Sequence, residues 1–526
     1  MTVSYNLLEE PWLPCIDDEN RLVNLSITEV VSQAHHVQEI RSGLPLITGG
    51  LFLFLIAYVM NIFKPESDQE WENLWRKGKF PVDTISRYNS LWHARLDLFD
   101  QKHPFFQDPK FGARPKDIKN LGAGKQPEPK GMSGLILHLA SGSNATLFDH
   151  SLDDSPYAYS QAEAAQLLIM LQAYSLGGMS SASLGKDKYF KDSAFGRGIT
   201  FLNRGSNLFE TLMLNIPSKN FVSFTGVNDK PCWERDDPFE DDRYQPDGII
   251  DLLTWQSRRI LLIPEELNDD IRVRFLLSAP GLSIMETYAN PFYHNRISTD
   301  GKKQSIKPLR FQEGRSLWRD STAILDLDSI NSENSLPVKW AAHLEADEYL
   351  EKQVVNLDLF GMCTQPGQKK AYFYEHETFT APIDYCKDRA LLERLEMGLS
   401  WAEKVKSDLF IASRELARFI VAPMHDLETE RTPGRDATDP LIQHWNAENE
   451  YWSRLEPAFY HFLINLPISD DAYIHWEKAI RQSARDALKY AADQVGSDPA
   501  GLKARAKAER SLGVLLNRTF NPQGKE

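Results

Sequence analysis

The sequence predicts an α+β protein with two domains, a large mixed N-terminal domain over residues 1–385 and a four-helix bundle over residues 386–526. Three observations predict this organisation. The chain has 526 residues, 42% of them hydrophobic, which is enough for more than one core at roughly 100–200 residues per domain. Short β-rich segments separated by turn residues occupy residues 250–375. An apolar stripe with helical spacing begins near residue 391, and helical patterns continue from there.

The N-terminal sequence predicts a short extended segment, followed by helices near residues 26–34, 45–63 and 67–76. The second helix, PLITGGLFLFLIAYVMNIF, is about long enough to cross a bilayer core of roughly 30 Å. However, it begins with proline, threonine and two glycines, carries Asn61 and stops at Lys64. We therefore predict a buried core helix and no membrane partner for the chain.

Another well-marked helix is predicted over residues 159–176. Ser160 is placed to cap it, and Glu163 stands three residues later, which is the spacing of a capping box. We expect this helix to end at Gly177 and Gly178, where the chain can take a positive φ. The residues that follow, 179–198, are rich in serine, glycine and lysine and predict a loop.

Residues 108–134 are rich in proline, glycine and lysine. Such a segment buries little apolar surface, so we predict an exposed, mobile loop that is either a solvated linker or an electrostatic arm. After residue 250 the pattern changes to strand-like segments with turn residues between them. Their sequences are RRILLI, IRVRFLLSAP, AILDLD, VVNLDLF and AYFYEH.

The C-terminal region reads as helix almost throughout. Apolar residues recur at steps of three and four over residues 391–419, which is typical of a helix in a bundle. A segment rich in proline, glycine and charge follows, and three more helical segments are expected near residues 440–465, 470–494 and 499–518. Four helices with short connections predict a four-helix bundle.

Charge and cysteine usage limit the function classes. The chain has 59 Lys and Arg against 74 Asp and Glu, giving a formal charge of −15, whereas a general electrostatic nucleic-acid binder is usually basic. Any nucleic-acid role must therefore come from local patches or from a complex. The four cysteines include no CxxC pair, so we expect no zinc or other metal site. Because the N-terminus lacks a basic stretch followed by an apolar one, we expect a cytoplasmic protein.

The residues give weak support for catalysis. Asp149 and His150, together with His425 in a His-Asp dipeptide, suggest an alternative function as a metal-dependent phosphohydrolase or nuclease. That chemistry needs further ligands on neighbouring helices, and no second convincing pair is found. The phosphate-binding, dinucleotide-binding, serine-hydrolase and zinc-protease motifs are all missing from the sequence. We therefore predict neither an enzyme nor a cofactor.

Two groups of cations suggest phosphate binding. Gly177 and Gly178 allow close backbone approach to a groove, and cations follow them within about twenty residues. A second group lies at four-residue spacing along one helix face. Each group is either an ordinary solvated surface or a strand-binding patch. The residues are Lys186, Lys188, Lys191, Arg197, Arg481, Arg485 and Lys489.

Five stretches stand in a consistent order along the chain. They are NLLEEPWLP at residues 6–14, HPFFQ at 103–107, ASGSNATLFDH at 140–150, FLNRGSNLFETLMLNI at 201–216 and TWQ at 254–256. Together with the helical C-terminal region, they resemble the CasA family, the large subunit of the type I-E CRISPR Cascade complex. The resemblance spans nearly the whole chain.

This resemblance implies a non-enzymatic recognition subunit that reads the protospacer-adjacent motif through the minor groove of double-stranded target DNA. It also implies help in opening the duplex for guide-RNA pairing and recruitment of a helicase-nuclease effector. The implied partners are the other Cascade subunits and the guide RNA, which reads sequence by base pairing. The motif-binding residues implied by position are Phe148, Asp149, His150, Gly177, Gly178, Gly367, Gln368 and Lys369.

Within that set, Phe148 falls on a loop aromatic, the two glycines on a loop against the minor groove, and Gln368 on a glutamine wedge beneath the motif. The chain departs from the family pattern in two respects. It cannot build the four-cysteine zinc site that some members carry. The motif-contacting lysine also lacks a counterpart near residues 281–286, which leaves the preferred motif sequence open.

Overall fold

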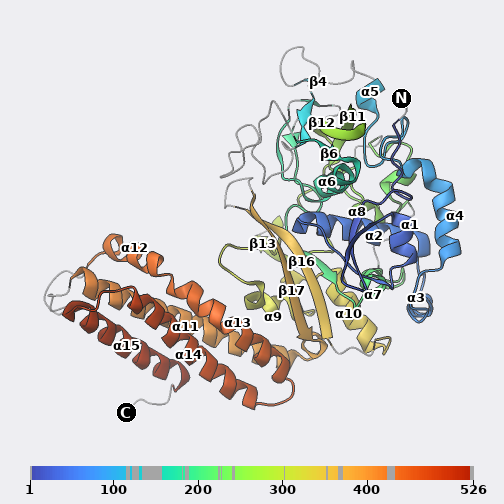
Figure 1. Cartoon of the computed structure of the whole chain (residues 1–526). Coiled ribbons are helices and arrows are strands. Elements are labelled where there is room, and N and C mark those ends of the chain that lie inside the picture. The colour runs from blue at the N-terminus through green and yellow to red at the C-terminus, as the bar shows by residue number, and fades with distance from the viewer. Residues whose placement is uncertain are drawn as a thin grey trace. The chain divides into compact units, whose positions relative to one another are not determined.

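A computed structural model describes residues 3–113, 119–120, 129–132, 157–180, 182–183, 189–222, 226, 228–239, 243–300, 303–350, 354–364, 371–422 and 433–521. It is a mixed α and β structure with a helical C-terminal region, so the predicted fold class is confirmed (Figure 1). The chain forms two compact units. Unit 1 comprises residues 1–315 and 327–380, and unit 2 comprises residues 316–326 and 381–526. Unit 2 therefore includes a short segment that the sequence places in the N-terminal domain.

Unit 1 is built around helix α2 (Pro45–Phe63), in which sixteen residues from Leu46 to Asn61 are buried. Aromatic rings pack against this helix. The ring centroid of its Phe54 lies 5.6 Å from the ring centroids of both Phe105 and Trp233. The helix is apolar on every face, which is the pattern of a fully buried helix. It passes a length-and-composition test for a membrane span, but 89% of the tested window is buried inside the fold. The prediction of a core helix is confirmed.

The helices predicted near residues 26–34, 67–76 and 159–176 are present, and each of them has a capping serine, which was predicted only for the last. Helix α1 (Ile27–Ser32) has a capping box formed by Ser26 and Glu29, and α6 (Gln161–Tyr174) has one formed by Ser160 and Glu163. Helix α3 (Asp68–Trp75) begins after the cap residue Ser67. The other helical elements of this unit are α4 (Val82–Trp92), η1 (His93–Leu96), α5 (Lys110–Ala113), α7 (Leu208–Leu214), η4 (Cys232–Glu234), α8 (Ile249–Leu253) and α10 (Leu336–Ala346).

Several small antiparallel sheets complete unit 1. Strands β1 (Leu13–Asp17), β2 (Leu22–Leu25) and β3 (Val37–Ile40) form a sheet in the order β2-β1-β3. Strands β11 (Arg258–Leu267) and β12 (Asp270–Pro280) form a long hairpin, and β5 (Lys130–Gly131) and β6 (Tyr159–Ser160) also pair with β12. A third sheet has the order β14-β13-β15, formed by β13 (Asn295–Asp300), β14 (Lys303–Pro308) and β15 (Ser332–Glu333).

Another three-stranded sheet has the order β10-β16-β17, formed by β10 (Thr200–Asn203), β16 (Val354–Thr364) and β17 (Ala371–Pro382). Two further short pairs join β4 (Lys119–Asn120) to β8 (Ala182–Ser183), and β7 (Gly178–Met179) to β9 (Tyr189–Phe190). The predicted strand AILDLD is wrong. Residues 321–325 instead form α9 (Ser321–Leu325), whose Ile324 and Leu325 are buried in unit 2.

The segment 108–134 is structured where it begins, over residues 108–113, and again over residues 129–132. Asp108 is buried and paired with Arg259, with 2.7 Å between Oδ2 and the guanidinium nitrogen, and Phe111 is also buried. Over residues 129–132, β5 lies against β12 and Met132 is buried. The prediction of one exposed loop is therefore wrong over these residues, because Asp108 and the apolar residues find partners far away in the chain. Residues 114–118, 121–128 and 133–134 lie outside the described part of the chain.

Unit 2 contains α11 (Arg389–Val421), α12 (Arg435–Trp445), α13 (Ala447–Asn465), α14 (Asp471–Asp493) and α15 (Pro499–Phe520), with the short elements η5 (Leu317–Asp320), α9 and η6 (Ile383–Cys386). The long helices α11, α13, α14 and α15 run side by side (Figure 1). Buried side chains tie α11 to its neighbours: Trp476 Nε1 donates to the Gly398 carbonyl at 2.8 Å, and Thr519 Oγ1 donates to Asp408 at 2.8 Å. The single segment expected at 440–465 is divided at Asn446, which has the left-handed conformation.

Candidate nucleic-acid interface

The predicted glycine loop forms a narrow β ribbon. Helix α6 ends at Tyr174, and Gly178 and Met179 then pair with Phe190 and Tyr189 across the β7–β9 ladder. The expectation of positive φ at Gly177 and Gly178 is wrong, since among the glycines described that conformation belongs to Gly78 and Gly314. The chain instead leaves the helix through an extended Ser175.

The two glycines of this ribbon differ in exposure. Gly177 is buried, and its backbone N–H donates to Asp192 Oδ1 at 2.7 Å. Gly178 is exposed, and a Cβ built on it would meet no atom within 4 Å. Gly178 is therefore the glycine at which another molecule has close access to the backbone.

A buried arginine fixes both sides of the ribbon. Arg258, 4% exposed, begins β11 and donates to the carbonyl oxygens of Leu176 and Lys191, each at 2.8 Å. The Leu176 carbonyl lies just before β7 and the Lys191 carbonyl lies just after β9, so Arg258 holds each of the two strands of the ribbon. The Arg258 guanidinium also lies over the Phe190 ring, 4.8 Å from its centroid, which is a cation–π distance. Burial lowers the pKa of Arg258 to about 10, so it stays charged at neutral pH.

The second predicted recognition element connects β16 to β17. Gly367, Gln368 and Lys369 lie within residues 365–370, outside the described residues. The flanking strands are neighbours in one sheet, and a connection of six residues is too short for a parallel crossover. His376 on β17 reaches Asp358 on β16, with 2.9 Å between Nε2 and Oδ1. The connection that carries Gln368 thus joins two paired strands, as its position between two β-like segments predicts.

The ribbon and strand β17 border one cavity of about 220 Å³. The ribbon contributes Met179 and Phe190, β11 contributes Arg258, and β17 contributes Tyr374, four residues after the undescribed connection. Lys130 on β5 also lines this cavity, and burial lowers the pKa of its ammonium group. Met179 and Tyr374 therefore line the same cavity, although more than 190 positions separate them in the sequence.

The predicted cations of unit 1 have different environments. Lys191 is exposed, whereas Arg197 is partly buried and pairs with Asp192, with 3.5 Å between Nε and Oδ2. Arg197 therefore helps to hold the Asp192 carboxylate, which accepts the hydrogen bond from the Gly177 N–H. The remaining predicted residues of this unit lie outside the described part of the chain. They are Phe148, Asp149, His150, Lys186 and Lys188.

In unit 2, Arg481 does not present a free charge. It pairs with Glu477 at 2.7 Å, donates to Asn517 Oδ1 at 3.3 Å and lies over the Phe520 ring at 4.5 Å. It therefore joins α14 to α15. Arg485 and Lys489 are exposed on α14, so the predicted patch is reduced to these two cations. The sequence spacing alone could not reveal that Phe520 and Asn517 lie beside Arg481.

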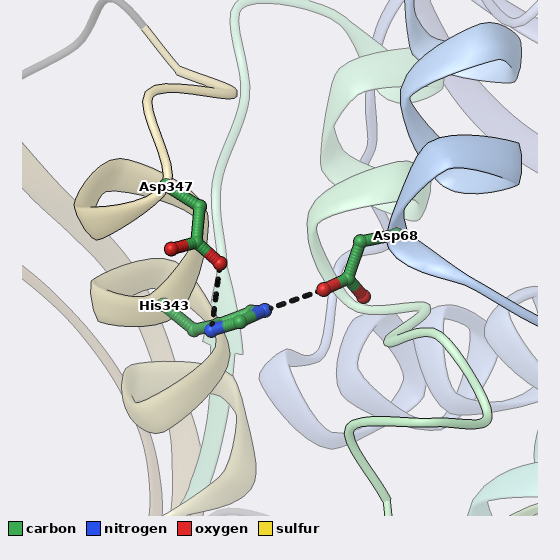
Figure 2. A group of neighbouring side chains, drawn as sticks. All are labelled: Asp68, His343 and Asp347. Atoms are coloured by element: carbon green, nitrogen blue, oxygen red, sulfur yellow. Dashed lines mark hydrogen bonds and ion pairs between the residues drawn. The ribbon is translucent and has the colours of Figure 1, made fainter.

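A histidine–carboxylate cluster was not predicted from the sequence (Figure 2). His343 Nε2 lies 2.8 Å from Asp68 Oδ2, and its Nδ1 lies 3.5 Å from Asp347 Oδ2. The Ser218 hydroxyl also donates to Asp68, and the Phe221 ring stacks on His343 with centroids 4.7 Å apart. Each imidazole nitrogen already faces a carboxylate, so the cluster acts as a contact between α3 and α10. His425 of the phosphohydrolase hypothesis lies outside the described residues.

Comparison with known proteins places the whole chain. The family model described as CRISPR-associated protein Cse1 matches residues 6–487. A CRISPR-associated protein CasA/Cse1 of Thermus thermophilus is 30% identical over 531 residues, covering 97% of each chain. A crystal structure of Thermus thermophilus CasA matches with a TM-score of 0.78 and 26% identity over 98% of this chain and 100% of that one.

Cse1 from Acidimicrobium ferrooxidans has the same fold, with a TM-score of 0.82 and 23% identity over 99% of both chains. The resemblance inferred from the motifs is thereby confirmed. Those motifs mostly serve the core: Trp12 and Phe105 are fully buried, and the Gln107 side chain accepts a hydrogen bond from the Leu262 backbone at 2.7 Å. On the family match and the relative that spans the chain, this protein belongs to the CRISPR-associated Cse1 family.

Proposed function

We propose that this protein is the large subunit of a type I-E CRISPR surveillance complex and reads a short motif in double-stranded DNA through the minor groove. Family membership supports the assignment to such a complex. A chain of a structure described as a CRISPR RNA-guided surveillance complex shares the fold, with a TM-score of 0.75 and 19% identity over 97% of this chain and 99% of that one. The observation that carries the proposal is the anchored ribbon with Gly178 exposed.

The ribbon suits recognition of a narrow groove. The minor groove presents a degenerate pattern of donors and acceptors, so a backbone contact there gives permissive reading of a short motif. The absence of a side chain at Gly178 lets the backbone approach the bases. Because Arg258 already holds both sides of the ribbon, little conformational entropy is lost when DNA binds.

Duplex opening is assigned to the connection between β16 and β17. Gln368 inserts between base pairs next to the motif, with Gly367 and Lys369 on either side. Unstacking a base step costs about a few kcal/mol, which contacts to the separated strands offset. Phe148, Asp149 and His150 supply further motif contacts. The cavity shared by the ribbon and β17 supports the proximity of the two elements.

The net charge of −15 defines what the partners must supply. The other Cascade subunits and the guide RNA provide most of the affinity for the target, and this chain adds local contacts through Lys186, Lys188, Lys191, Arg485 and Lys489. The subunit has no bond-breaking role, acts in the cytoplasm and recruits a helicase-nuclease that degrades the target. The negative net charge of the chain also limits nonspecific DNA binding by the free subunit.

A reconstituted complex tests this function. The chain is combined with its Cascade partners and guide RNA, and equilibrium binding is measured on duplexes that differ only in the motif. We expect binding and duplex opening to depend on the motif and on this chain. Motif-independent binding would contradict the proposal. DNA cleavage by the purified chain that requires a divalent metal would support the phosphohydrolase or nuclease alternative instead.

A further inference from the structure

A second cavity of unit 1, about 110 Å³ in volume, is lined by two of the stretches that identify the family. All of HPFFQ, residues 103–107, borders this cavity, and Gln256 of TWQ borders it from a distant part of the sequence. Among the described residues it shares no lining residue with the cavity beside the β7–β9 ribbon. It is smaller than a cavity of about 150 Å³ that holds a benzene molecule, so it has room for one small chemical group.

Two glutamines line this cavity, and only one of them has its side chain satisfied. Gln107 is 5% exposed, and its Oε1 accepts from the Leu262 N–H while its Nε2 donates to the Leu98 carbonyl, both at 2.7 Å. Gln256 is 2% exposed, yet its Oε1 has no hydrogen-bond partner. A buried acceptor without a partner is unfavourable, so Gln256 destabilises the chain unless a donor reaches it from outside.

The charged residues around the cavity leave no charge for a ligand. Every lining aspartate, arginine and lysine already has an ion-pair partner. Burial lowers the pKa of His103, so this lining side chain is neutral at neutral pH. A ligand in the cavity is therefore itself neutral, because a charge buried without a partner is unfavourable. The ion pairs are Arg95–Asp236, Lys110–Asp237, Arg259–Asp108 and Arg235–Asp247.

Arg235, which also lines the cavity, provides an unused donor. Its Nη2 donates to Asp247 Oδ2 at 2.8 Å, whereas its Nε is buried and has no hydrogen-bond partner. The lining residues therefore offer one unused acceptor, on Gln256, and one unused donor, on Arg235. A carboxamide or a hydroxyl group is neutral and can both donate and accept, so either group matches this combination.

We propose that this cavity receives a carboxamide or hydroxyl side chain of a protein partner, which donates to Gln256 Oε1. The inference rests on the proposed function and adds to it a docking point for another protein subunit of the complex. The opening of the cavity favours protein over nucleic acid as the partner. Asp236 lines the cavity, and its side chain is 93% exposed, so a carboxylate stands at the opening and repels phosphate. Protein interfaces commonly concentrate their binding energy where one side chain fills a pocket of the partner.

Replacing the unpaired acceptor tests the docking point. Equilibrium association is measured between the purified chain and a complex of the remaining subunits with guide RNA, together with the melting temperature of the free chain. Gln256→Met should weaken the association about tenfold, because the partner's donor loses its acceptor. It should keep or raise the melting temperature, because methionine has a similar size and buries no unpaired oxygen. Gln107→Met is the matched control, and it should lower the melting temperature because it removes satisfied hydrogen bonds.

The opposite result has a defined meaning. If ordered water alone occupies the cavity, Gln256→Met should lower the melting temperature and associate as the wild type does. That result would overturn this inference alone. A wild-type chain that fails to join the complex would overturn the proposed function instead.

Photocrosslinking in the assembled complex identifies the partner. A benzoylphenylalanine at position 236, at the opening of the cavity, is irradiated in the presence of guide RNA and target duplex. We expect crosslinks to one protein subunit, and fewer of them when Gln256→Met is added. The same probe at position 330, where Ile330 is 92% exposed in the same unit, shows the background from an exposed position. Crosslinks from position 236 to nucleic acid alone, or to protein only at the background level, would overturn the inference.

Discussion

The guanidinium of Arg258 lies 4.8 Å from the centroid of the Phe190 ring, in the interior of unit 1. The same group bonds to the carbonyl oxygens on both sides of the ribbon, so one buried cation determines where the ribbon begins. A charged group inside a protein is stabilised only when its donors are satisfied, and here backbone carbonyls satisfy them. The position of Gly178 in front of this anchor is therefore a consequence of Arg258.

Replacing Arg258 should lower both the stability of the chain and the preference of the complex for the motif. We expect Arg258→Gln to lower the free energy of unfolding by about 2–4 kcal/mol, because buried carbonyls lose a charged donor. It should also reduce the preference of the complex for the motif, because the ribbon loses its fixed position. Denaturant unfolding and binding to motif and non-motif duplexes, both at a temperature where the variant is folded, measure the two effects.

The adjacent Arg259 is a matched control. It lies on the opposite face of β11, pairs with the buried Asp108 and covers the Phe239 ring at 4.2 Å. Arg259→Gln should cost a similar amount of stability, since it leaves a buried carboxylate without its partner. Its motif preference should stay at the wild-type level. Equal loss of motif preference in both variants would mean that Arg258 acts only through overall stability.

Much of the fold follows from local patterns. Helix α2 and the capped helix α6 are visible in the sequence because apolar composition and capping residues are local signals. The role of Arg258 is not visible, because its partners Leu176 and Lys191 lie 82 and 67 residues away.

The sequence predictions that are wrong have identifiable physical causes. The segment AILDLD alternates like a strand, but its apolar residues pack into unit 2 as the short helix α9. Arg481 fits a cationic stripe by spacing, yet tertiary packing places it over Phe520. The family motifs identify the chain because they build its core, as Trp12 and Gln107 show, whereas the recognition residues carry no comparable local pattern.

Gln368 should affect duplex opening more than initial binding. In Gln368→Ala complexes we expect initial motif binding to stay within about threefold of wild type, whereas R-loop formation falls at least about tenfold, because the amide no longer replaces lost stacking. Strand separation can be followed by permanganate reactivity of unpaired thymines. The exposed Gln312, which pairs with Arg315 across a turn of two residues, is the control, and Gln312→Ala should behave as wild type. Unchanged R-loop formation in Gln368→Ala would refute the wedge role.

The cations of α14 should divide into two classes. We expect the double variant Arg485→Gln, Lys489→Gln to lower R-loop stability and weaken its salt dependence without changing the melting temperature, since both side chains are exposed. Arg481→Gln should instead lower the melting temperature, because it breaks the contacts to Glu477 and Phe520. R-loop dissociation at several salt concentrations and thermal unfolding measure the two classes. No effect of the double variant on the R-loop would exclude α14 as a strand-binding face.

The His343 cluster should matter for stability and not for metal binding. His343→Leu should lower the free energy of unfolding by about 1–2 kcal/mol, because Asp68 and Asp347 lose their partner in a partly exposed site. Treatment of the wild type with a chelator should leave its melting temperature unchanged. A melting temperature that falls with the chelator and recovers when a divalent metal is returned would identify the cluster as a metal site.

We propose that DNA approaches the backbone at Gly178, and one substitution at this glycine tests the approach most directly. A Cβ at this position meets no atom of the described protein within 4 Å, and valine suits a strand, so Gly178→Val should fold as well as wild type. Gly43→Val, at another exposed glycine with open space around it, is the control. Equilibrium binding of the assembled complex to motif duplex should fall at least about tenfold for Gly178→Val and not for Gly43→Val. Wild-type affinity in the Gly178 variant would contradict the account.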